Sequence, residues 1–120
     1  MDERRAKRVS EALREELSEL IGYEMTDPRV GGVDVTEVHI APDMRVASVR
    51  VSLPAAEDER RGALEALEHA KGFLRREVGR RLQLFRVPDF RFEADAELAG
   101  SHDRVQQLLK RIRKGRPKDE

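Results

Sequence analysis

Apolar residues recur at steps of three and four over residues 57–85, which is the spacing of one face of an α-helix. The stripe comprises Leu64, Leu67, Ala70, Leu74, Val78, Leu82 and Phe85. Gly72 interrupts it, and a glycine inside a helical pattern often marks a bend. The pattern therefore predicts two helices joined at a tight kink at Ala70-Lys71-Gly72, not one straight helix.

The rest of the chain predicts two further helices and three strands. A helix is predicted over residues 2–24, and its apolar face carries Ala6, Val9, Leu13, Leu17, Leu20 and Ile21. Residues 33–41 and 45–53 alternate as two strands of a hairpin, although a phase change between Val35 and Val38 predicts a β-bulge. A third strand follows Pro88, with Phe90, Phe92 and Ala94 on one face. A last helix is predicted over residues 101–113.

This order of elements is helix, strand, strand, helix-kink-helix, strand, helix. It predicts an α+β fold in which helices pack on one face of a three-stranded sheet. We expect one domain over residues 2–113 and a disordered basic tail over residues 114–120. The strand-helix-helix-strand core matches the KH architecture, but Ala70-Lys71-Gly72 stands where KH modules usually have a Gly-x-x-Gly loop.

Composition limits the function classes. The 24 basic and 24 acidic residues give a net charge of zero, so overall positive charge cannot indicate nucleic-acid binding. The charged start of the chain and the lack of a long apolar segment predict no signal peptide and no membrane span. Cysteine is absent, which is consistent with a cytoplasmic protein, and we expect a monomer without cofactors.

The charge is nevertheless uneven along the kinked helices. Residues 57–69 contain five acids and two arginines, whereas residues 71–91 contain seven basic residues and two acids, a local net charge of +5. The helix that follows the kink is therefore the candidate RNA-binding element. Its site residues are Lys71, Gly72, Arg75, Arg76 and Arg80. Such a run can also be an ordinary solvated face. Aromatic residues are only 4% of the chain, so phosphate contacts are favoured over base stacking as the main binding mode.

Basic residues at four other positions bear on this interpretation. Arg81 falls inside the apolar stripe, so we expect it to pair with Glu77 and leave it out of the site. Arg4, Lys7 and Arg8 lie near the start of the first helix, where the helix dipole disfavours cations. These three residues either meet an anionic partner or are offset by neighbouring acids on a solvated face, and both interpretations stay open.

No pattern indicates catalysis or a metal site. There is no phosphate-binding Gly-Lys-Ser/Thr run, and no Ser-His-Asp arrangement stands out. His39, His69 and His102 are far apart and lack the spacing of metal ligands. Asp27 and Asp43 lie in turns, where Asp commonly forms local hydrogen bonds. We therefore predict a protein that is not an enzyme and holds no metal.

Several short motifs follow one another in a fixed order from about Arg4 to Ile112. They are Arg8-Val9, Asp27-Pro28-Arg29, Val35-Thr36-Glu37-Val38, Ala41-Pro42-Asp43-Met44, Ala47 to Ser52, Ala70-Lys71-Gly72-Phe73-Leu74-Arg75, Arg86-Val87-Pro88, Phe92, Asp95 and Arg104 to Ile112. In their order and spacing, these motifs resemble the ribosome-binding factor A family. The chain departs from the family's usual aliphatic residue before the Arg-x-Pro by having Phe85, which we expect to be harmless because the position stays apolar.

The resemblance implies a type II KH fold and a ribosome assembly factor that is not an enzyme. It implies binding to free or immature 30S subunits through 16S rRNA, help with late maturation including 5′-end processing of 16S rRNA, importance in the cold, and release aided by an assembly GTPase. The alternative is a protein-interaction module that docks through Glu57-Asp58-Glu59 or the last helix. A DNA-binding helix-turn-helix fits less well, because strands flank the helix pair on both sides.

Overall fold

The computed structural model describes residues 3–95 and shows an α+β fold in the predicted order. The predicted last helix over residues 101–113 and the tail over residues 114–120 lie outside this range. The elements are α1 (Glu3–Glu19), a π-helical turn (Leu20–Glu24), a 3-10 turn (Pro28–Val30), β1 (Asp34–Ile40), β2 (Val46–Ser52), α2 (Glu57–His69), α3 (Lys71–Leu82) and β3 (Asp89–Ala94).

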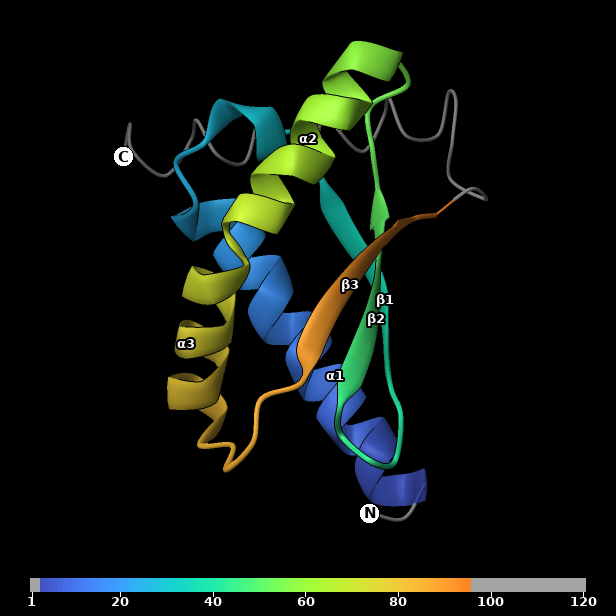
Figure 1. Ribbon diagram of the computed structural model, residues 1–120, viewed down its shortest axis with the longest axis vertical. Helices are drawn as coiled ribbons and strands as arrows, with labels where there is room; N and C mark the ends of the chain where they lie inside the picture. Colours follow the sequence, from blue (N-terminus) through green and yellow to red (C-terminus); the bar gives the residue numbers. More distant parts are fainter. Residues whose placement is uncertain (1–2, 96–120) are drawn as a thin grey trace, which may run out of the picture.

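The three strands form one sheet in the order β1-β2-β3. β1 and β2 are antiparallel, while β3 runs parallel to β2 because the α2–α3 pair crosses from one to the other. The register shifts between Val35 and Glu37, which confirms the predicted bulge. Figure 1 shows the three α-helices gathered on one side of the sheet, as the amphipathic patterns require.

The core lies between this sheet face and the helices. Apolar residues of β2 alternate inward at Ala47, Val49 and Val51, as predicted, and Phe90 of β3 is fully buried beside them. Ala94 is exposed, so the prediction that it continues the apolar face of β3 is wrong. Burial along β3 is thus confined to its first half, at Phe90, with Phe92 partly buried.

Helix α1 buries the predicted face and one polar residue that the pattern missed. Ser10 is buried, and its Oγ accepts a hydrogen bond from the backbone N–H of Ile40 at 3.0 Å. Ile40 belongs to β1, an edge strand whose outer N–H groups have no neighbouring strand among residues 3–95. The serine therefore satisfies one such donor and fixes α1 against the sheet edge.

The predicted kink is present, but it lies at Ala70. Helix α2 ends at His69 and α3 begins at Lys71, while Ala70 has φ −87° and ψ −1°. The N–H of Leu74 donates to the carbonyl of Ala70 at 2.9 Å, so α3 starts immediately. Gly72 lies inside α3, and attributing the bend to this glycine is therefore wrong.

The apolar stripe of α2 and α3 is buried over most of its length. Leu67, Leu74 and Val78 are fully buried, and Leu82 packs partly against the same core. Phe85 is the exception, because its side chain is completely exposed (104%). The expectation that Phe85 extends the stripe is wrong, since α3 ends at Leu82 and the chain turns away at Gln83, which has φ 53°.

Arg81 holds α3 against the N-terminal helix. It reaches Glu77 at 3.4 Å, as predicted, and also Glu24 at 2.6 Å and Glu16 at 3.5 Å. The side chain of Arg81 is 23% exposed, compared with 69% for Arg80 on the same helix. Because one guanidinium bonds carboxylates from three segments, it links α3 to α1 and to the turn that follows α1.

We predict that Arg81→Met lowers the melting temperature by a few degrees, because three carboxylates lose their shared cation while the apolar stem is kept. Arg80→Met is the matched control. It removes only the exposed pair with Glu77, and such pairs contribute little to stability. Thermal unfolding followed by circular dichroism compares the two variants, and equal shifts would contradict the structural role of Arg81.

Candidate nucleic-acid interface

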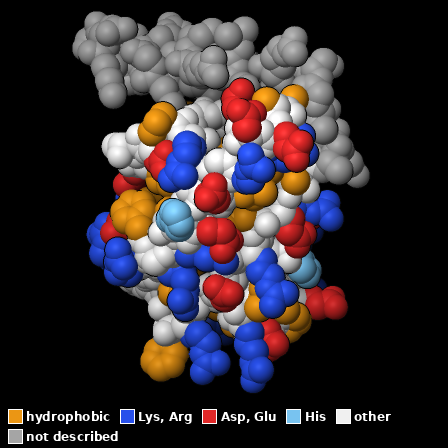
Figure 2. All heavy atoms as spheres, turned by 45° about the horizontal axis from the view of Figure 1, so that its top comes forward, with side chains coloured by type: hydrophobic (Ala, Val, Ile, Leu, Met, Phe, Trp, Pro, Cys, Tyr) orange, Lys and Arg blue, Asp and Glu red, His pale blue; other side chains and the backbone are white. Residues whose placement is uncertain are grey.

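The two helices joined at Ala70 carry opposite charge. Helix α2 has five acidic residues and two arginines, a net charge of −3. Helix α3 has five basic residues and one acidic residue, a net charge of +4. In Figure 2 Lys and Arg side chains are most numerous over the lower part of the face, with some Asp and Glu side chains among them. A protein of zero net charge therefore presents a locally basic surface.

Four predicted cations of α3 lie outside the buried stripe, each in a different setting. Lys71 pairs with Glu68 of α2 at 3.1 Å. Arg76 is exposed, and among residues 3–95 it pairs with no carboxylate. Its guanidinium lies over Gly72, where an added Cβ would stand 3.5 Å from an Arg76 Nη atom. Gly72 is itself exposed, so the backbone here is open to a ligand.

Arg75 and Arg80 point to the two flanks of α3. Arg75 donates from Nη2 to the carbonyl oxygen of Val87 at 3.2 Å and so reaches the connection to β3. Arg80 donates to Glu77 at 2.7 Å, and this hydrogen bond lowers the pKa of the Glu77 carboxyl, with Arg81 adding to the effect. Glu77 thus stays ionised and neutralises part of the charge on that flank.

The basic start of α1 forms a second group. Arg4, Lys7 and Arg8 are all exposed. Arg81 meets α1 at Glu16, which lies twelve residues beyond Arg4, roughly 18 Å along a helix axis. Figure 1 likewise shows the start of α1 below the β1–β2 hairpin and α3 at the other side of the molecule. The structure brings the α3 residues together and does not join the α1 cations to them.

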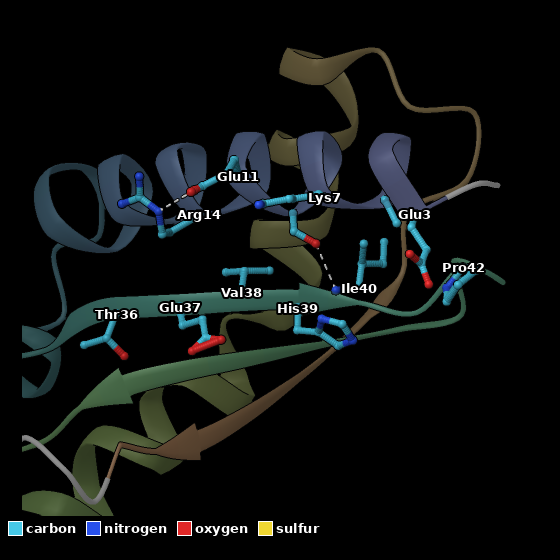
Figure 3. A pocket seen from close by; sticks show the side chains of 12 residues that line it. Glu3, Lys7, Glu11, Arg14, Thr36, Glu37, Val38, His39, Ile40 and Pro42 are labelled. Carbon is cyan, nitrogen blue, oxygen red and sulfur yellow. Dashed lines mark hydrogen bonds and ion pairs between the residues drawn. The ribbon is translucent and has the colours of Figure 1, made fainter.

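A groove of about 630 Å³ runs between α1 and the edge strand β1. Figure 3 shows Lys7, Glu11 and Arg14 along its helix side and Glu37 and His39 along its strand side. Arg14 is already bonded to Glu11 at 2.9 Å. This mixture of charges does not favour a polyanion, so the groove is a weaker candidate for RNA than α3.

The acidic residues and histidines of the described part of the chain are its candidate metal ligands. Within residues 3–95 no group of three His, Asp or Glu side chains could hold a metal ion. Asp27 accepts the backbone N–H of Arg29, and Asp43 accepts that of Arg45, so both act in turns as predicted. The Arg29 side chain also holds the pKa of the Asp27 carboxyl below its usual value.

No helix in this part of the chain is long and apolar enough to span a membrane.

Sequence reasoning missed two features of this site. The first is that Glu24 pairs with Arg81 across 57 residues, a contact that no local spacing can indicate. The second is the connection between α3 and β3, which Arg75 contacts and in which Phe85 is exposed. Pro88 was the available signal, because a proline disfavours helical backbone in the residue before it.

Comparison with known proteins identifies the family. The family model for ribosome-binding factor A matches residues 5–109. A ribosome-binding factor A from Solibacter usitatus is 50% identical over 120 residues, which cover all of this chain and 97% of the relative.

Two solved structures agree with this match. The crystal structure of ribosome-binding factor A from Thermus thermophilus is 30% identical, with a TM-score of 0.67 over 74% of this chain and 93% of that chain. A homology model of the Thermus thermophilus protein, fitted into an electron cryo-microscopy map of its complex with the 30S subunit, is also 30% identical. Its TM-score is 0.59, over 73% of this chain and 92% of that chain. The chain therefore belongs to the ribosome-binding factor A family.

Proposed function

We propose that this protein binds the small ribosomal subunit through 16S rRNA, using the basic outer surface of α3. The observation that carries the proposal is the charge of α3, which is +4 on a chain of zero net charge. The buried side of α3 is supplied by Leu74 and Val78, and Arg81 is the cation that holds the helix in place, so the other four cations are not needed for the fold. A family member from Thermus thermophilus has been placed in a 30S complex, which supports the choice of partner.

The binding surface comprises Lys71, Gly72, Arg75, Arg76 and Arg80 in this proposal. Helix α3 begins without a side-chain cap, so its positive dipole end adds to the attraction for phosphate. α2 and α3 act as the helix pair of a KH-like module, with Gly72 at the point where backbone and RNA come closest. Arg4, Lys7 and Arg8 form a separate, second contact with RNA.

The protein acts as a non-catalytic assembly factor in the cytoplasm. It holds an rRNA conformation during late maturation, including 5′-end processing of 16S rRNA, and it matters most in the cold, where RNA misfolding is slow to reverse. It works as a monomer, and an assembly GTPase aids its release. These points rest on membership of the family, and the charge of α3 supports the RNA contact itself.

The proposal predicts that Arg76→Gln with Arg80→Gln weakens binding to purified 30S subunits and flattens its salt dependence. Each phosphate contact contributes roughly 0.7 to 0.9 to the slope of log affinity against log salt, so the slope should fall by about 1 to 2 units. Both side chains are exposed, and the fold should be unaffected. Affinity measured across a salt series gives the slope.

The matched control is Arg50→Gln with Arg61→Gln, which removes the same charge from two exposed positions on β2 and α2. We expect this variant to keep the wild-type slope. If the control flattens the slope as much as the α3 pair does, or if neither variant changes it, α3 is not the RNA-binding surface.

Gly72 gives a prediction in which stability and binding move in opposite directions. Gly72→Ala should stabilise the fold by up to about 1 kcal/mol, because a Cβ meets only ordinary contacts inside the helix. The same Cβ should weaken 30S binding by blocking close approach to the backbone.

Gly62→Ala in α2 is the control, since its Cβ would stand 3.6 Å from the Arg29 side chain, also an ordinary contact. It should stabilise without loss of affinity. Urea unfolding and 30S affinity are measured together for both variants, and a Gly72→Ala protein that binds like the wild type would contradict close approach at this position.

A further inference from the structure

Phe85 is exposed on a connection that is otherwise anchored. The connection runs from Gln83 to Pro88 between α3 and β3, and Figure 1 shows it at the lower end of α3, at the outside of the molecule. Leu84 and Val87 are partly buried against the core on either side. Phe85 lies between them with its side chain fully exposed. The ring of Phe85 is therefore exposed to solvent, although its neighbours in the loop are partly buried.

Three contacts hold the backbone around Phe85. The N–H of Leu84 donates to the carbonyl of Gly79 at 3.2 Å, and Gln83 takes up the left-handed conformation that this bond requires. Val87 packs so closely on Gly79 that a Cβ there would lie 2.8 Å from Val87 Cγ2. Arg75 donates to the Val87 carbonyl at 3.2 Å. A ring presented from a fixed backbone loses less conformational entropy when it binds a ligand.

The surroundings of the ring are positively charged. Arg86 follows Phe85 directly and is exposed. Arg75 reaches the same connection and uses one of its five N–H donors there, which leaves others for a phosphate. Single exposed apolar side chains are common and need no explanation alone. A fixed aromatic ring beside arginines is instead the arrangement with which proteins hold unpaired bases of RNA.

We propose that Phe85 stacks on an unpaired base of RNA, while Arg86 and Arg75 bind the phosphates on either side of that base. The inference rests on the proposed binding of RNA by α3 and extends that surface onto the loop beyond the helix. It adds one aromatic contact to a binding mode that still depends mainly on phosphates, in keeping with the low aromatic content of the chain. A protein surface is less favoured as the ligand because the flanking groups are cations.

The test compares two substitutions at one exposed position. Phe85→Leu keeps an apolar side chain but removes the flat ring, and should lower the affinity for purified 30S subunits by roughly tenfold. The salt slope should not change, because no charge is altered. Phe85→Trp should bind at least as tightly as the wild type. Melting temperatures should match for all three proteins, since the side chain contacts no core residue.

A second measurement identifies the partner of the ring. A photoreactive benzoyl-phenylalanine at position 85 should cross-link to 16S rRNA within the 30S complex. Cross-linking to a ribosomal protein, or wild-type affinity of Phe85→Leu, would overturn the stacking proposal. If the α3 arginine pair still flattens the salt slope in that case, RNA binding by α3 survives and only the role of Phe85 fails.

Discussion

The pairing of Arg81 with three carboxylates is the interaction on which the placement of α3 depends. Helix α3 has only two fully buried side chains, Leu74 and Val78, which is a narrow apolar face for a helix of 12 residues. Arg81 supplements it by bonding Glu16 and Glu24 at distances of 3.5 and 2.6 Å. One basic residue thus serves the fold, and the remaining cations of α3 are left on the outer surface.

The break at Ala70 separates the charges of the two helices. A single straight helix would carry the acids of α2 and the bases of α3 along one axis, and RNA approaching the basic half would also meet acidic side chains. Because α3 begins directly after Ala70, the basic segment runs in a different direction from α2, as Figure 1 shows. It also places Lys71 beside Glu68, so the junction itself is neutralised and the net positive charge lies further along α3.

Most of the fold was predictable because local periodicity determines it. The phase change in β1, the inward alternation of β2 and the buried positions Leu74 and Val78 all follow from spacing alone. Contacts between distant segments were not predictable. The sequence gives no sign that Ser10 bonds Ile40 or that Glu24 bonds Arg81, because neither pair is local. The exposure of Phe85 was missed for a related reason: helix spacing was extended past Leu82, where Gln83 turns the chain.

The candidate site was predictable as a set of cations but not as a surface. Charge counting found the basic helix, and helix periodicity already set Arg81 apart from the exposed cations. Only the structure shows that Arg81 also bonds Glu16 and Glu24, whereas Arg76 is exposed. It also shows that Arg4, Lys7 and Arg8 lie apart from α3, since α3 meets α1 at Glu16. Spacing within one helix carries no information on which of its cations another segment will neutralise.

Directed hydroxyl-radical probing tests the central claim most directly. The chain contains no cysteine, so Arg76→Cys provides a single attachment point for an iron chelate on the outer surface of α3. Arg61→Cys places the same probe on the exposed surface of α2. In complexes with 30S subunits, we predict strong cleavage of 16S rRNA from position 76 and little from position 61. Cleavage from position 61 with none from position 76 would contradict the account.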